Sequence, residues 1–215
     1  MKIAVLIYYS DITTKYNFNW VSQCLRSIKN QTHQDFVIFE NNYESHFSMV
    51  KLSKLFEDKE YYFFDKKHKN YVQSLNFLMK KAFDKDFEAV ININIDDYYD
   101  NNYFKKCIEY SKNNDLVSSK YCLIKDNKII KQDINTKGEI IIGNILQNIN
   151  CIIKSGVFIT KRYYDNVGHF EELIPIEHKL YWKAGVRKHM RFNVIPEYLI
   201  FYRIHKNQSS SKIFS

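Results

Sequence analysis

The chain has 215 residues, a formal net charge of +8 and 45% hydrophobic residues, and its two prolines and five glycines exclude a loop-rich or disordered polymer. This length fits one large domain, and no apolar run approaches the roughly 20 residues that cross a bilayer. The positive charge favours anionic partners such as nucleotides, nucleic acid or an acidic membrane surface. The four cysteines, Cys24, Cys107, Cys122 and Cys151, form no CxxC pair. We interpret them as reduced and structural, which is typical of a cytoplasmic protein.

The first half of the chain alternates between strand-like and helix-like segments. Apolar runs predict strands, and apolar residues at helical spacing predict helices. The predicted strands are Ile3–Tyr8, Phe36–Phe39, Tyr61–Phe64 and Ala89–Asp97, and the predicted helices begin near Asn17, Met49, Tyr71 and Tyr103. This alternation predicts an α/β fold with a mostly parallel sheet and helices on both faces.

The second half carries more strand-like sequence. We expect strands over Asp115–Ile124 and Lys128–Asp133, further β-structure over Gly138–Gly143 and Cys151–Thr160, and a late strand over Val194–Tyr202. A helix is expected over Glu177–Lys188, and residues 206–215 are expected to form a polar tail. We treat 1–215 as one domain, in which 1–112 binds the ligand and 113–205 covers the cleft.

The most informative stretch is the strand that ends in Asp96 and Asp97. Its isoleucines share one face and Asn92, Asn94 and Asp96 share the other, because successive strand side chains alternate. A polar file that ends in a carboxylate predicts a strand whose carboxyl end opens into a ligand cleft. Two acids there could hold Mg²⁺ or Mn²⁺, which in turn binds phosphate. They could equally be a solvated pair that precedes a helix.

Other polar residues are candidates for the same edge. Glu40 and Asn41 end the second strand and could accept hydrogen bonds from a base or ribose, or simply form a polar turn. Arg203 and His205 could contact phosphate or metal, and Glu177 or His178 could act as a general base. A helix start that favours Glu is the alternative for Glu177. The sequence contains no GxGxxG, Walker, GxSxG or HExxH motif.

Several strings, in order, resemble the family 2 glycosyltransferases, which have a GT-A fold (Rossmann-like) and a DxD-type metal site. The strings are Lys2–Asp11 (KVSVIIPTYN), Ser27–Phe36 (SIxxQTxxDF), His68–Ala82 (NxGxxxARNxGxxxA), Asn94–Asp97 (DxDD), Val167–Leu173 (VGGFDEx), Glu177–Trp182 (Glu-Asp before Leu-Trp) and Tyr202–His205 (YRxH). Within them Asn76 and Ala82 match, and Asn70 replaces a glycine, as Asn does best where φ is positive.

The resemblance implies an inverting transfer from a nucleotide-sugar, most simply a UDP-sugar, to a hydroxyl of a glycan or another acceptor. It implies a hexosyl- or deoxyhexosyltransferase that uses Mn²⁺ or Mg²⁺, with no nucleic-acid partner. Asp96 and His205 would hold the metal, and Glu177 first and His178 second would be the base. The donor would be bound by Tyr8, Tyr9, Glu40, Asn41, Asn70, Asn76, Asn94, Asp96, Asp97 and Arg203.

The departures from the family pattern matter for mechanism. Asn94 stands in place of the first acid of the DxDD string, so Asp96 is the main expected ligand and Asp97 its structural neighbour. Glu40 and Asn41 stand in place of an Asp pair, and His178 in place of an Asp. A non-catalytic sugar-nucleotide-binding homologue, a nucleotidyltransferase and a basic nucleic-acid-binding protein are the alternative hypotheses.

Overall fold

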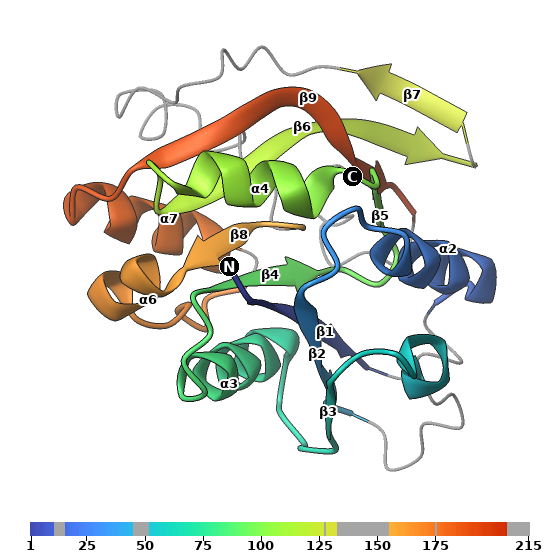
Figure 1. The fold of residues 1–215 in the computed structure, drawn as a ribbon, viewed down its shortest axis with the longest axis horizontal. Helices are drawn as coiled ribbons and strands as arrows, with labels where there is room; N and C mark the ends of the chain where they lie inside the picture. Colours follow the sequence, from blue (N-terminus) through green and yellow to red (C-terminus); the bar gives the residue numbers. More distant parts are fainter. Residues whose placement is uncertain (11–15, 45–51, 127, 133–154, 175, 206–215) are drawn as a thin grey trace.

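The computed structural model of the chain describes residues 1–10, 16–44, 52–126, 128–132, 155–174 and 176–205. Its helices and strands follow the chain order shown in Figure 1. They are β1 Ile3–Tyr9, α2 Phe18–Lys29, β2 Phe36–Asn42, the 3₁₀ helix η1 Leu52–Phe56, β3 Tyr61–Phe64, α3 Tyr71–Phe83, β4 Ala89–Ile93, β5 Tyr98–Tyr99, α4 Tyr103–Ser111, β6 Leu116–Lys125, β7 Lys128–Gln132, β8 Phe158–Thr160, α6 Lys161–Val167, α7 Glu177–Arg187 and β9 Phe192–Arg203.

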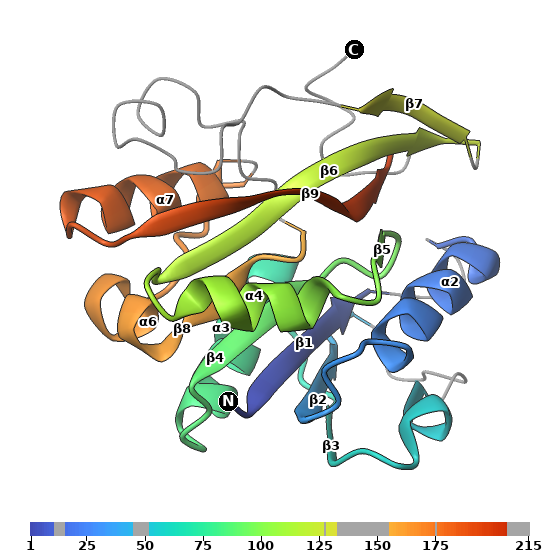
Figure 2. The ribbon, with the colours of Figure 1, turned by 45° about the horizontal axis from the view of Figure 1, so that its top comes forward.

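One sheet runs through both halves of the chain. Its order in the described residues is β3-β2-β1-β4-β8-β6-β9-β5, with β7 paired to β6. Parallel pairs join β3, β2, β1 and β4, and also β6 and β9, whereas β8 is antiparallel to both β4 and β6. When the top of the molecule is turned forward, β6 and β9 lie side by side and cross above β1 and β4 (Figure 2). The predicted α/β fold, with parallel strands in its first half and helices on both faces, is confirmed.

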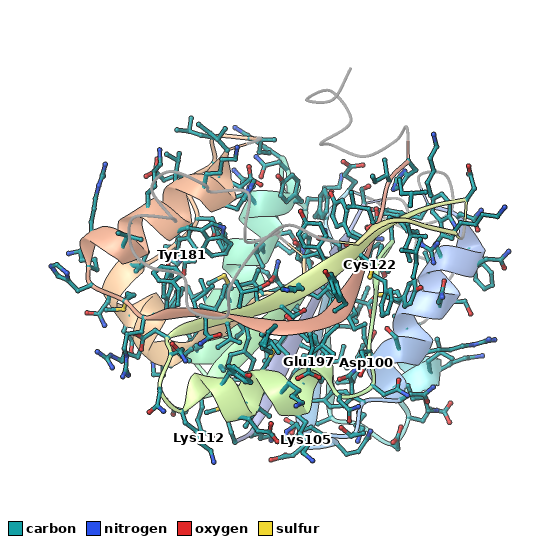
Figure 3. All side chains as sticks on the ribbon, turned by 90° about the horizontal axis from the view of Figure 1, so that it is seen from above. Asp100, Lys105, Lys112, Cys122, Tyr181 and Glu197 are labelled. Atoms are coloured by element: carbon teal, nitrogen blue, oxygen red, sulfur yellow. The ribbon has the colours of Figure 1, made fainter. Side chains whose placement is uncertain are left out.

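Two apolar cores cover the two faces of this sheet. One core combines Leu6, Phe39 and Val90 with residues of α3, α6 and α7. The other combines Ile7, Ile91 and their neighbours with residues of α2, α4 and η1. Alternate side chains of β1 therefore enter different cores, because strand side chains alternate between faces. Seen from above, Tyr181 lies on α7 at the left of the view and Cys122 lies along β6 toward the right (Figure 3).

Most predicted elements are present, with several changes of extent. The second strand continues through Glu40 to Asn42, so these residues are part of β2 and not a polar turn. The strand predicted to end in Asp96 and Asp97 is β4, and it ends at Ile93. Asn94 to Asp97 form a turn in which Asp97 N donates to Asn94 O at 3.2 Å. The helix predicted from Met49 to Phe56 is described only as the short η1.

Some predictions fall on residues that the structure does not describe. Gly138–Gly143, the first part of Cys151–Thr160, Cys151 itself and the tail 206–215 lie outside the described residues. The described cysteines, Cys24, Cys107 and Cys122, are buried. Among the described residues, no helix combines the length and the apolar character that crossing a bilayer requires.

Helix caps explain where two helices begin. Asn17 caps α2 by accepting from Asn19 N, and Asn70 caps α3 by accepting from Gln73 N at 3.0 Å. Asn70 has φ −156°, which is extended backbone. No positive φ is needed at Asn70, and its side chain serves as a helix cap.

Gln31 joins three elements through a buried amide. Its Nε2 donates to Ser27 O at 2.9 Å and to Asp100 O at 2.7 Å, while its Oε1 accepts from Phe104 N at 2.9 Å. The side chain is 1% exposed, so each of these bonds replaces one to water. The Gln-Thr string of the family resemblance thus fixes the end of α2 to β5 and α4.

We expect Gln31→Ala to lower the free energy of unfolding by about 2–3 kcal/mol, because it leaves buried backbone groups at Asp100 and Phe104 without a partner. Urea unfolding followed by circular dichroism measures the change. Lys29→Ala, an exposed change on the same helix, is the control and should alter stability by less than about 0.5 kcal/mol. Equal effects of the two substitutions would contradict the role of Gln31.

Candidate active site

The carboxyl ends of β1, β2 and β4 lie at one edge of the sheet because these strands are parallel and in register. Leu6 pairs with Phe39 of β2 and with Asn92 of β4, so the residues that follow on each strand come together. Tyr8 donates from its hydroxyl to Asn94 Oδ1 at 3.2 Å. This bond joins the tips of β1 and β4, two of the segments that the sequence predicts at the cleft.

Asp96 and His205 meet at this edge. Asp96 Oδ2 lies 2.8 Å from His205 Nε2, and the two side chains are 14% and 11% exposed. The residues are far apart in sequence, so only the fold brings them together. The His205 ring packs on Trp20 of α2, with 5.0 Å between ring centroids. Trp20 therefore holds the imidazole beside the carboxylate.

Asp97 carries out a different task from Asp96. It is 0% exposed, and its Oδ1 accepts from the backbone nitrogen of Arg203 at 2.8 Å. Burial, and then the charge of Asp96, hold the pKa of Asp97 well above its ordinary value. The prediction that Asp97 is a structural neighbour fits this geometry, since its carboxyl group ties the end of β9 to the tip of β4.

Arg203 provides a fixed cation next to both acids. Its guanidinium lies over the rings of Trp20 and Tyr98, at 5.3 and 5.4 Å, and donates to Gln23 Oε1. Burial lowers the pKa of Arg203, while Tyr98, Asp97 and Asp96 act in the opposite direction. Arginine keeps its charge in proteins, so positive potential is maintained where a diphosphate would need it.

The Asp96–His205 pair fits a divalent cation. Ligands at about 2.1 Å from an octahedral ion lie about 3.0 Å apart when they occupy adjacent positions. Asp96 Oδ2 and His205 Nε2 share a hydrogen bond at 2.8 Å, and this separation is close to that spacing. Among the described residues no group of three or more His, Cys, Asp or Glu side chains could hold a metal. Two protein ligands suit an ion that takes its remaining ligands from substrate phosphates and water.

The amino end of α7 reaches the same region through Tyr71. Tyr71 donates from its hydroxyl to Glu177 Oε1 at 2.5 Å and stacks on Tyr8, with 6.4 Å between centroids and 14° between planes. Contacts thus run from Glu177 through Tyr71 and Tyr8 to Asn94. Tyr71 and Trp20 were not singled out as site residues by sequence, since a tyrosine after a helix cap and a tryptophan on an apolar helix face carry no chemical signature.

Four other residues predicted to contact the donor have different surroundings. Tyr9 and Glu40 point into the α2 side of the sheet, where the Tyr9 hydroxyl donates to Glu40 Oε1. Asn41 is 0% exposed and holds the loop after β3 through Lys66 O, Lys66 N and Ser74 Oγ. Asn76 both donates to and accepts from the backbone of Phe170, at 2.9 Å each. These side chains are directed into the protein because they form hydrogen bonds with polar atoms of the fold.

Solved structures of other proteins have a similar fold. S. aureus TarS 1–349 in complex with UDP-GlcNAc superimposes with a TM-score of 0.76 at 16% identity, covering 98% of this chain and 61% of that one. The mannosyltransferase PcManGT from Pyrobaculum calidifontis, in complex with GDP-Man and Mn²⁺, gives a TM-score of 0.69 at 10% identity, covering 98% of this chain and 59% of that one.

These likenesses show the fold, which is that of GT-A glycosyltransferases. The chain spans about 60% of the length of either solved chain. No family model matches the sequence, and no curated protein matches it.

The buried Glu40 gives a pH dependence of stability that can be measured. Burial raises the pKa of Glu40 from its ordinary 4.5 to about 7, and the bond from Tyr9 opposes this shift. The folded state therefore binds a proton that the unfolded state has already lost between these two values. The contribution of Glu40 to stability should fall as the pH rises from about 4.5 to about 7 and then level off.

We expect Glu40→Gln, which mimics the protonated group, to remove this fall. The variant should gain up to about 3 kcal/mol relative to the parent protein between pH 5 and pH 8, because each pKa unit corresponds to about 1.4 kcal/mol. Urea unfolding of both proteins across this range measures the difference. Parallel pH profiles would contradict the assignment.

Proposed function

We propose that this chain is a metal-dependent glycosyltransferase that moves a sugar from a nucleotide-sugar, most simply a UDP-sugar, to a hydroxyl acceptor. The observation that carries the proposal is the Asp96–His205 pair at 2.8 Å, beside Arg203 and the Tyr8–Asn94 bond, at the carboxyl edge of the parallel strands. Ligands bind at this edge in open α/β sheets. The likeness to the folds of TarS bound to UDP-GlcNAc and of PcManGT bound to GDP-Man and Mn²⁺ supports it.

Each residue of the edge has a role in the proposed reaction. Asp96 and His205 would hold Mn²⁺ or Mg²⁺, which supplies charge neutralisation for the departing nucleoside diphosphate. Arg203, whose guanidinium lies over the Trp20 ring, adds fixed positive potential. Asn94, held by Tyr8, offers amide groups to the donor without adding negative charge close to its phosphates. The neutral Asn94 therefore lowers the repulsion that a second carboxylate would create.

The acceptor hydroxyl would attack the anomeric carbon from the face opposite the leaving group, which inverts its configuration. A base at the amino end of α7 would take the proton of that hydroxyl, and Glu177 and His178 both lie there. The contacts from Glu177 through Tyr71 and Tyr8 to Asn94 support the placement of this base beside the donor.

A thermal-shift screen tests donor binding. The protein is heated with UDP-GlcNAc, UDP-glucose, UDP-galactose or GDP-mannose, with and without Mn²⁺. A donor at ten times its Kd should stabilise the protein by about 1.4 kcal/mol, which raises Tm by about 3–6 °C for a protein of this size. We expect this rise with at least one donor, and only when Mn²⁺ is present. No rise with any donor would contradict the proposed function.

Substitutions at the metal pair test the site itself. We expect Asp96→Asn and His205→Ala to lose the Mn²⁺-dependent part of the Tm rise, because each removes one of the two protein ligands. Asp84→Asn, which removes an exposed carboxylate bonded to Lys80 at the end of α3, is the matched control and should retain it. A full Mn²⁺-dependent rise in Asp96→Asn would show that the metal binds elsewhere. Donor binding without turnover by the parent protein would favour the non-catalytic alternative.

A further inference from the structure

The first turn of α7 places two proton-accepting side chains next to each other. Glu177 is the first residue of the helix and His178 the second. The family that the sequence resembles has Glu-Asp at this point, so an imidazole stands here in place of a carboxylate. The inference below rests on the proposed function and concerns how this chain removes the acceptor proton.

Glu177 is enclosed and already engaged. Its side chain is 3% exposed, and its Oε1 accepts the hydroxyl hydrogen of Tyr71 at 2.5 Å. Burial, and then the bond and charge of Glu177, raise the pKa of Tyr71, so this hydroxyl remains a donor. The amino end of a helix also favours negative charge. These contacts hold the Glu177 side chain in place and leave it little access to an acceptor.

His178 has the opposite character. Its side chain is 17% exposed, several times more than that of Glu177, and its Nδ1 lies 3.5 Å from Glu177 Oε1. Nδ1 itself is buried and has no hydrogen bond to any described residue. A carboxylate at this distance can take up the Nδ1 hydrogen after a small movement, because catalytic hydrogen bonds are commonly long before substrate binds.

We propose that His178 is the catalytic base, and that Glu177 and Tyr71 are positioning residues that hold its imidazole. Tyr71 anchors Glu177, Glu177 accepts from Nδ1–H of His178, and Nε2 is left as the proton acceptor. A carboxylate that orients an imidazole in this manner is a general device for fixing the tautomer of a basic histidine.

The proposed step balances in atoms and charge. The acceptor oxygen forms a bond to the anomeric carbon while its proton moves to Nε2 of His178. The bond from the anomeric carbon to the donor phosphate oxygen breaks, and its electron pair leaves with the nucleoside diphosphate. The imidazolium that results lies next to the Glu177 carboxylate, which offsets both its positive charge and the unfavourable field at the helix amino end.

The same contacts connect this base to the donor site. Tyr71 stacks on Tyr8, and Tyr8 donates to Asn94 at the tip of β4. Gln73 strengthens the frame from the same first turn of α3, since its Oε1 accepts from Lys69 N and its Nε2 donates to Glu172 Oε2 at 2.7 Å. The first turn of α3 therefore contacts both Tyr8 of β1 and Glu177 of α7.

The test measures release of nucleoside diphosphate with water as acceptor, using the donor from the screen above that raises Tm most. We expect His178→Ala to lower kcat by about 100-fold or more, with the donor KM and the donor-induced Tm rise unchanged. Added imidazole should raise the kcat of His178→Ala by at least about tenfold, because imidazole can occupy the vacated space and take the proton. If His178 had only a structural role, added imidazole would not raise the kcat of His178→Ala.

The positioning residues have a distinct expected pattern. Glu177→Gln should lower kcat by about tenfold or more, and Tyr71→Phe should lower it by about threefold or more. In both variants the donor KM should be unchanged, and added imidazole should not restore activity. Lys183→Gln, a polar change further along α7, is the matched control and should behave as the parent protein.

Two results would overturn the inference. The first is a Glu177→Gln loss larger than that of His178→Ala together with no imidazole rescue of His178→Ala, which would make Glu177 the base. The second is a parent protein that binds donor yet releases no nucleotide. Failure of the proposed function looks different, because no donor would then raise Tm in any of these proteins.

Discussion

The candidate site depends on one hydrogen bond, from the backbone nitrogen of Arg203 to Oδ1 of the buried Asp97. It joins the end of β9 to the turn after β4, two segments that are not neighbours in the sheet. Once Arg203 is held there, His205 two residues later can reach Asp96, and the guanidinium of Arg203 can lie against Trp20. A buried carboxyl group beside a second carboxylate is costly, and the nearby cation together with this backbone donor offsets that cost.

The alternation of strand side chains assigns neighbouring residues to separate tasks. Tyr8 faces α3 and the donor edge, while Tyr9 faces α2 and bonds the buried Glu40. In the turn after β4 a similar division follows from the turn geometry, since Asp96 meets His205 while Asp97 enters the interior. Each such pair combines a residue available to a ligand with one that stabilises the sheet behind it. The edge is therefore held from its inner side, behind the side chains that the proposed reaction would use.

Several strings that carry the family resemblance are structural. Gln31 joins α2 to β5 and α4, Asn70 caps α3, and Asn76 fixes α3 to Phe170. Buried amides with two or three partners tolerate few replacements, because any other side chain leaves backbone groups unsatisfied. Such residues mark the fold as reliably as catalytic residues do, and they explain why a likeness in order and spacing predicts architecture better than it predicts chemistry.

The sequence by itself determined the alternation of strands and helices, the parallel sheet of the first half and the polar tip at Asn94 to Asp97. Local periodicity and capping residues decide these features, and both are local properties of the chain. Only the tertiary structure decided which polar residues lie together. Glu40 and Asn41 follow each other in sequence but face different cores, whereas Asp96 and His205, or Tyr71 and Glu177, are distant and yet in contact. The reason is that strand register and helix packing, which set these contacts, act between segments that the sequence presents separately.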